Sequence, residues 1–224
     1  MKKFTLLNKA TSTKLFKTSS NLVEYVVIEE ELNDLFDFCM LIQESTLQKT
    51  NDLSLNCKEL EQEPYRRYDF DGISFNNEDI LQGIKDFEIP SWTEILQFTV
   101  PMNQILLISI FLEKSLKGLC AEYDPNNESE YYGGYDFKLR KPNRESTIHF
   151  YIKFLENTCK IENLSDSTIA YLNQNLRPLR NSFVHGDRNL IEKYSGEINI
   201  NKVFTSVSEL FHIIESQYTT KNER

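Results

Sequence analysis

Arg180, Asn181 and His185 stand within six positions of one another, and their side chains suit chemistry at a phosphodiester. Cleavage of RNA by its own 2′-hydroxyl needs a base for that hydroxyl, an acid for the departing 5′-oxygen and a cation for charge on the phosphorane. A histidine, whose ordinary pKa is about 6.5, can carry either proton, and arginine offers a planar fork for phosphate oxygens. The three residues therefore predict RNA cleavage that needs no metal and no cofactor.

The spacing assigns a role to each of these residues. On a helix, Asn181 and His185 are i and i+4, so they share a face and Asn181 could orient the imidazole. Arg180 lies about 140° around the helix from His185 and must reach the phosphate with its long side chain. We therefore expect His185 to exchange protons, Arg180 to stabilise phosphate charge and Asn181 to position the two.

One such histidine per chain leaves one proton carrier missing. A twofold dimer that packs two copies of this segment together would supply a second His185 and a second Arg180 to the same cleft. The sequence therefore predicts a homodimer with a composite site.

The segment also resembles a known family. Arg180-Asn181-x-x-x-His185-Gly186 is similar to the RNxxxHG signature of the HEPN superfamily, and the apolar helix that ends at Phe111–Lys117 resembles an earlier HEPN helix. The similarity covers roughly residues 91–218, but only the short motif is specific. Some members carry a tyrosine two positions after the histidine that a partner enzyme modifies; Asp187 stands there, so that form of regulation is not expected.

This resemblance implies a metal-independent endoribonuclease with a composite site in a homodimer. It further implies a toxin or antiphage defence effector whose partner is an antitoxin or sensor protein. The acidic helix from Glu24 to Asp37 could serve as a docking face, although a solvated face is the simpler interpretation. A second hypothesis is a non-catalytic HEPN-like module that binds RNA or a nucleotide, or acts as a scaffold. In the plainest interpretation, Arg180 is a solvated helix charge and His185 a capping or core residue.

Cations near the motif and in an aromatic-rich segment at 131–144 are candidate RNA contacts, because single-stranded nucleic acid favours stacked rings beside positive charge, although ordinary loop packing is the simpler interpretation of that segment. These candidates are Arg177, Arg188, Lys138, Arg140, Lys141 and Arg144. Glu113 could face the cleft as an acid, but its spacing also favours a surface pair with Lys117 at i+4.

Five segments carry the 3.6-residue apolar period of helices, at about 21–46, 91–123, 145–161, 165–186 and 201–218. Ser91 is the expected N-cap of the second helix, and Pro101 should kink or divide it. The stretch Ile105–Leu112 is apolar all round, which predicts the central helix of the core. Pro178 should kink the fourth helix or start it afresh, and Gly186 should end it. The pattern predicts an all-α, HEPN-like helical bundle.

The remaining segments are expected to decorate a single domain that spans 1–224. They are a basic, solvated arm at 1–20 and long connections at about 50–90 and 124–144, with minor strands near Phe4–Leu7 and Tyr68–Phe75. A chain of 224 residues needs no disulfide or structural metal to hold its core. Its four cysteines lie at least 18 positions apart, which argues against a zinc ribbon or a thioredoxin-type site.

Charge and hydropathy limit the partners. The net charge is −9, so polyanion binding requires local convergence of cations and should be sensitive to salt. The longest apolar stretch, Ile105–Leu112, is well short of the about 20 residues that span a bilayer. We therefore expect a cytoplasmic protein with reduced thiols and no membrane partner.

Overall fold

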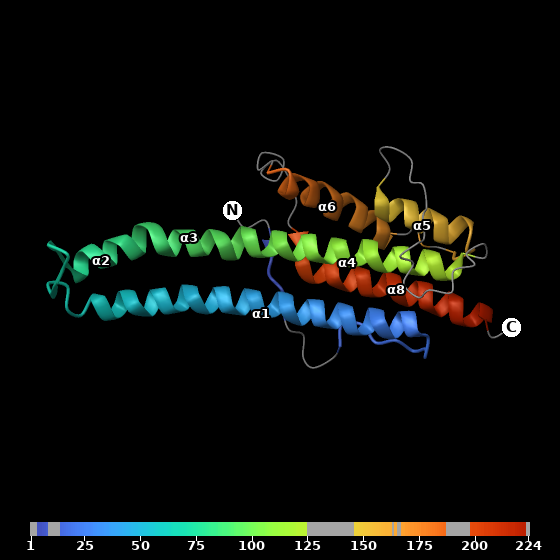
Figure 1. The fold of residues 1–224 in the computed structure, drawn as a ribbon, viewed down its shortest axis with the longest axis horizontal. Coiled ribbons are helices and arrows are strands. Elements are labelled where there is room, and N and C mark those ends of the chain that lie inside the picture. The colour runs from blue at the N-terminus through green and yellow to red at the C-terminus, as the bar shows by residue number, and fades with distance from the viewer. Residues whose placement is uncertain are drawn as a thin grey trace.

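Two long antiparallel helical runs give the molecule its elongated shape (Figure 1). The computed structural model describes residues 4–8, 14–124, 146–162, 164, 167–186 and 198–222. The first run is α1 (Val23–Leu60), and the second extends beside it from Asn77 to Tyr123. At about 1.5 Å per residue they are roughly 57 and 70 Å long, so both extend well beyond the shorter helices that pack against one end.

The shorter helices assemble around α4 (Val100–Tyr123), which contacts α1, α5 (Thr147–Asn157), α6 (Ser167–Val184) and α8 (Ile200–Asn222). We call α4, α5, α6, α8 and residues 23–44 of α1 the bundle. The predicted all-α bundle with five long helical runs is confirmed. The predicted central helix is also confirmed, because its inward side chains are almost fully buried: Ile105, Ile108, Leu112, Leu116 and Leu119.

The second helical run stays continuous although it contains Pro90 and Pro101. It consists of α2 (Asn77–Gly83), the π-helical turn η1 (Ile84–Glu88), α3 (Ile89–Glu94), the π-helical turn η2 (Ile95–Thr99) and α4. Each proline stands two residues after a π turn. Proline lacks an N–H and its ring collides with the carbonyl four residues earlier, and the extra residue of a π turn relieves both problems.

The predicted start of this helix at Ser91 is therefore wrong, and Pro101 does not divide the run. The run begins instead at Asn77, where Asn76 and Asp79 form a reciprocal capping box. The Asn76 side chain accepts from the Asp79 N–H at 3.0 Å, and the Asp79 carboxylate accepts from the Asn76 N–H at 2.9 Å. This cap satisfies two N–H groups that would otherwise lack partners at the helix start.

The expected long connection at 50–90 is also wrong, because only residues 61–76 are non-helical between the two runs. Within them β2 (Arg67–Phe70) and β3 (Ile73–Asn76) form an antiparallel hairpin, which confirms the strands expected near Tyr68–Phe75. The turn is made by Asp71 and Gly72, whose φ angles of 51° and 77° are typical of a tight hairpin turn. We call residues 47–94, which extend away from the bundle, the arm (Figure 1).

The N-terminal segment packs against the bundle where the structure describes it. β1 (Phe4–Thr5) pairs in parallel with β4 (Ile198–Asn199), as expected for a strand near Phe4. Phe16 is fully buried, and the buried carboxylate of Glu215 accepts hydrogen bonds from the N–H groups of Ser19 and Ser20 at 2.9 and 3.1 Å. Residues 14–20 therefore pack against the bundle through Phe16, although the side chains of Lys14 and Lys17 are exposed, as expected for a basic, solvated arm. The predicted connection at 124–144 lies outside the described residues after Asp124.

Among the described residues, the run Asn77–Tyr123 is the one helix that is long and apolar enough to cross a membrane. Of its most apolar stretch, 56% is buried inside the protein. Core helices commonly share this composition, so packing in the bundle accounts for its apolar character.

Candidate functional site

Helix α6 positions the motif residues at its C-terminal end. Its inward stripe of Leu172, Leu176 and Leu179 is buried, which fixes the rotation of the helix and leaves Asn181 and His185 exposed. Pro178 lies inside the helix on the exposed side, and α6 continues through it. The helix is neither interrupted nor restarted at this proline.

The last turn of α6 confirms the predicted helix end. The His185 N–H donates to the Asn181 carbonyl at 3.0 Å, and the Gly186 N–H donates to the Phe183 carbonyl at 3.1 Å. Gly186 has a φ of +68°, a left-handed conformation that glycine adopts without strain and that ends helices. Asn181 and His185 therefore lie one turn apart on one face, as their spacing predicts.

Arg180 points away from this face and toward α4. Its Nη1 donates to Oε1 of Glu113 at 2.6 Å, and the two side chains are 30% and 23% exposed. Glu113 therefore pairs across helices with Arg180, whereas the i+4 spacing favoured Lys117. A charge-assisted bond of this kind limits where the guanidinium can lie.

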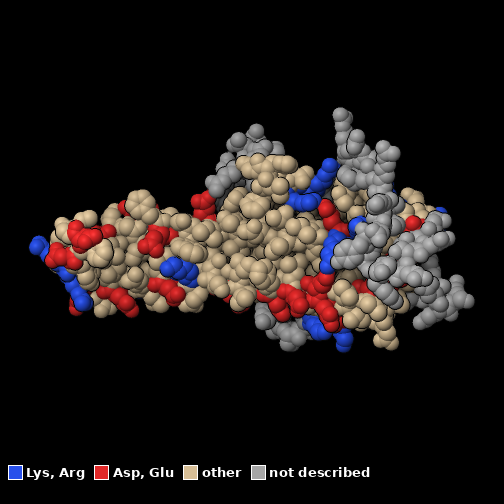
Figure 2. All heavy atoms as spheres, viewed as in Figure 1, with Lys and Arg blue, Asp and Glu red and all other residues tan. Residues whose placement is uncertain are grey.

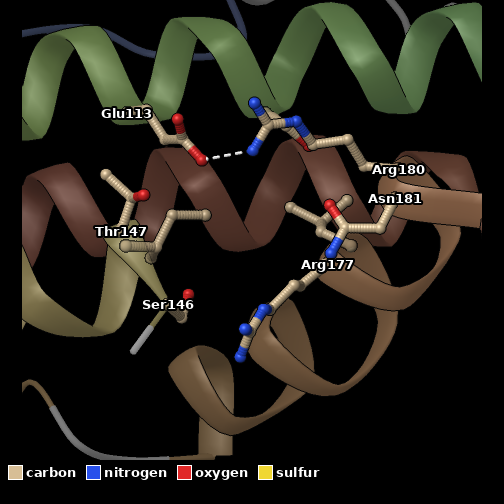
Figure 3. Close-up of a pocket in the computed structure, with 9 residues that line it drawn as sticks. Glu113, Ser146, Thr147, Arg177, Arg180 and Asn181 are labelled. Atoms are coloured by element: carbon tan, nitrogen blue, oxygen red, sulfur yellow. Dashed lines mark hydrogen bonds and ion pairs between the residues drawn. The ribbon is translucent and has the colours of Figure 1, made fainter. Parts of the chain in front are cut away.

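A polar pocket of about 160 Å³ surrounds this ion pair at the junction of α4, α5 and α6. Figure 3 shows Arg180 and Glu113 pointing toward each other beside Ser146 and Thr147, which stand at the start of α5. Nine residues line it: Ser109, Glu113, Ser146, Thr147, Ile148, Leu176, Arg177, Arg180 and Asn181.

The electrostatics of this pocket favour an anion with hydrogen-bonding oxygens. Arg177 and Arg180 supply two permanent positive charges, and Glu113 pairs with Arg180. The first turn of α5 adds N–H groups and the positive end of its helix dipole. Nearby on α5, burial raises the pKa of Tyr151, and the Cys120 thiol and the Glu113 carboxylate add to that shift.

The structure brings some predicted site residues together and leaves one apart. Arg180, Asn181, Arg177 and Glu113 share the pocket, whereas His185 is exposed at the end of α6 and does not line it. Asn181 connects the two places, because it lines the pocket and lies one turn before His185. One chain therefore presents a phosphate-sized polar pocket with a histidine outside its rim.

Five other predicted RNA contacts lie outside the described residues: Arg188, Lys138, Arg140, Lys141 and Arg144. Sequence reasoning missed Ser109, Ser146 and Thr147. Ser146 and Thr147 stand at the start of an amphipathic stretch, and Ser109 interrupts an apolar run; these were the available signals. Over the described ranges, no group of three His, Cys, Asp or Glu side chains could hold a metal ion.

The chain was compared with known protein families, curated proteins and solved structures. No family model, curated protein or solved structure matches the chain.

Proposed function

We propose that this protein is a metal-independent endoribonuclease that cleaves RNA through attack of the 2′-hydroxyl. The observation that carries the proposal is the pocket that gathers Arg177, Arg180 and Asn181, with Asn181 one helical turn before the exposed His185. A phosphate group fits the charge and the hydrogen-bonding groups of this pocket. The imidazole of His185, which lies outside the rim, has the chemistry to move protons to and from an RNA that extends beyond the pocket.

Two copies of these residues supply every group that the reaction needs. A base removes the proton of the 2′-hydroxyl, and the 2′-oxygen attacks phosphorus. The bond from phosphorus to the 5′-oxygen then breaks, and an acid protonates the departing oxygen. The products are a 2′,3′-cyclic phosphate and a 5′-hydroxyl end. Arg180 stabilises the charge on the phosphorane, which is the term that usually lowers such barriers most.

The scheme requires two proton carriers, and a homodimer supplies them. Arg177, Asn181, Val184 and His185 form an exposed stripe at i, i+4, i+7 and i+8 along α6, and Val184 is 58% exposed. A twofold contact along this stripe is self-complementary and brings two His185 side chains to one cleft. Glu113 holds Arg180 at the wall of the pocket until a phosphate competes for the guanidinium.

The test is incubation of the purified protein with RNA in EDTA, followed by analysis of the RNA ends. We expect 2′,3′-cyclic phosphate products, a loss of about 10²- to 10⁴-fold in rate for His185→Ala and a loss of about 10²- to 10³-fold for Arg180→Ala. His212→Asn is the matched control, because His212 is 47% exposed and lies on α8. Equal cleavage by wild type and His185→Ala would overturn the proposal.

The dimer is tested separately by a charge on the exposed stripe. Val184→Asp should yield a monomer in sedimentation and should lose RNA cleavage with it, because two aspartates would face each other across the twofold axis. Leu47→Asp places the same charge at a 44% exposed apolar position on α1, and we expect it to leave both readouts unchanged. A monomer that cleaves RNA at the wild-type rate would exclude the composite site.

A second candidate function is RNA or nucleotide binding without catalysis. Two observations favour it: His185 does not line the pocket, and Glu113 already occupies Arg180. Retained RNA affinity without scission in the same assay would support this module. Under the first proposal, the biological setting is a toxin or antiphage effector in the cytoplasm, restrained by an antitoxin or sensor protein.

A further inference from the structure

A second cavity lies between the start of α1 and the end of α4, and it is separate from the polar pocket. It has a volume of about 200 Å³ and is lined by Val23, Glu24, Val27, Ile28 and Glu31 of α1 and by Lys114, Ser115, Gly118, Leu119 and Glu122 of α4. Gly118 is about 140° around α4 from Glu113 and about 180° from Ser109. We call this cavity the α1–α4 groove; it opens on a different face of α4 from the polar pocket.

The floor of the α1–α4 groove is apolar and accessible. Ile28 and Leu119 form its buried base, at 4% and 1% exposure, whereas Val23 and Val27 at its edge are 53% and 41% exposed. Val23 and Val27 lie within one turn of each other, and both keep apolar surface in contact with water. Removing that surface from water would be favourable, so a bound partner that covers it would be stabilised. The groove has room for a large apolar side chain.

The rim of the α1–α4 groove is acidic. Glu31 pairs with Lys114 across the two helices, which neutralises that part of the rim. Among the described residues, no cation pairs with the other two rim carboxylates, Glu24 and Glu122. Burial raises the pKa of Glu24, and the nearby Glu122 carboxylate adds to the shift. Figure 2 shows that Asp and Glu side chains also gather along the N-terminal half of α1.

We propose that the α1–α4 groove binds a basic amphipathic segment of a partner protein. An apolar side chain of that segment inserts between Val27 and Leu119, and flanking Lys or Arg side chains pair with Glu24 and Glu122. Charge complementarity selects this occupant: the carboxylates would repel nucleic acid, and a second copy of a chain with net charge −9 offers no general attraction. The site is separate from the proposed RNA-cleaving site, so either proposal can fail without the other.

The probe is a fluorescein-labelled synthetic helix of 14 residues built from leucine and lysine only, with the leucines on one face. Fluorescence anisotropy with the full chain measures its affinity. We expect the double variant Glu24→Lys/Glu122→Lys to weaken binding by roughly tenfold or more, because two charge pairs become repulsive. Val27→Asp should weaken it similarly, and Val27 is exposed enough for the variant to fold. Glu59→Lys, an exposed acid at the far end of α1, is the matched control and should bind as the wild type does.

Two further peptides decide whether the groove itself is responsible. A leucine–glutamate helix with the same apolar face should not bind, and a lysine–serine peptide without that face should bind at least about tenfold more weakly. Circular dichroism of each variant checks folding. The proposal is overturned if the wild type does not bind the leucine–lysine helix, if the double reversal binds it equally, or if the lysine–serine peptide binds as tightly.

Discussion

The bundle and the arm share their two long helices but differ in how deeply they are packed. The bundle has a continuous core to which all of its helices contribute, whereas the arm has a separate cluster with three buried members, Leu53, Cys57 and Ile84. The polar pocket is lined by α4, α5 and α6 of the bundle and by Ser146, which directly precedes α5. A region with few buried contacts can open locally without global unfolding. We therefore expect a rigid site in the bundle and an arm that opens independently of it.

The first and largest expected effect comes from a cavity in each region. Leu112→Ala should lower the free energy of unfolding by about 2 to 5 kcal/mol, because Leu112 is 0% exposed at the centre of the bundle. Leu53→Ala should instead speed hydrogen exchange of amides in the arm and shift the global transition little. Chemical denaturation and exchange mass spectrometry measure the two effects. If both variants lowered the global transition equally, the arm and the bundle would be one cooperative unit.

A second test uses three buried thiols as probes of local opening. Cys39 and Cys120 lie in the bundle at 1% and 0% exposure, and Cys57 lies in the arm at 5%. All three should react only when the structure around them opens. In variants that each retain one of these cysteines, we expect Cys57 to react with a thiol reagent at least about tenfold faster than the other two, because less structure must open. Equal rates would show that the arm opens only when the bundle does.

The arm also explains why part of the fold could not be predicted from sequence. Apolar periodicity identified the bundle helices because each has a continuous buried stripe, as in Leu172, Leu176 and Leu179 of α6. In the arm, the buried face of α1 falls to a few widely spaced positions such as Leu53 and Cys57, so the pattern fades although the helix continues. Pro90 was interpreted as the start of a helix because sequence alone does not reveal the π turn that accommodates this proline inside a helical run.

The candidate site was predictable to the extent that it is local. Arg180, Asn181 and His185 are close in sequence, so helix spacing predicted the shared face of Asn181 and His185. The Arg180–Glu113 pair joins residues 67 positions apart and depends on how α6 packs on α4. Ser109, Ser146 and Thr147 come from two other helices and enter the pocket only through tertiary packing.

A third test concerns alkaline pH, which should lower the stability of the bundle. Burial raises the pKa of the Cys39 thiol to about 12, and it also raises the pKa values of Cys120, Tyr25 and Tyr123. The unfolded chain releases these protons first, so their contribution to stability is complete below about pH 9 and declines toward pH 12. For Cys39 the loss is about 1.4 kcal/mol for each pH unit above that of the unfolded thiol.

Denaturation midpoints between pH 8 and pH 11 measure this effect, and the variant Cys39→Ala isolates the contribution of the Cys39 thiol. In that variant, the free energy of unfolding should decline less steeply with pH than in the wild type. The difference in slope should correspond to the release of up to one proton on unfolding. Cys57→Ala in the arm is the control for loss of a buried thiol in a region that contributes less to the global transition. A decline that is unchanged in Cys39→Ala would show that this thiol does not contribute to the alkaline loss of stability.

The smallest expected effect is at the far end of the arm, where one side chain starts a long helical run. Asn76→Ala removes the acceptor of the Asp79 N–H, and loss of such a cap typically costs about 1 kcal/mol. The cap lies outside the bundle, so exchange of the first α2 amides should rise while the global midpoint and any RNA cleavage stay at wild-type values. Asn76→Asp, which retains the acceptor, should restore protection. If Asn76→Ala changed cleavage, the tip of the arm would be coupled to a pocket in the bundle, and the division between the two regions would have to be abandoned.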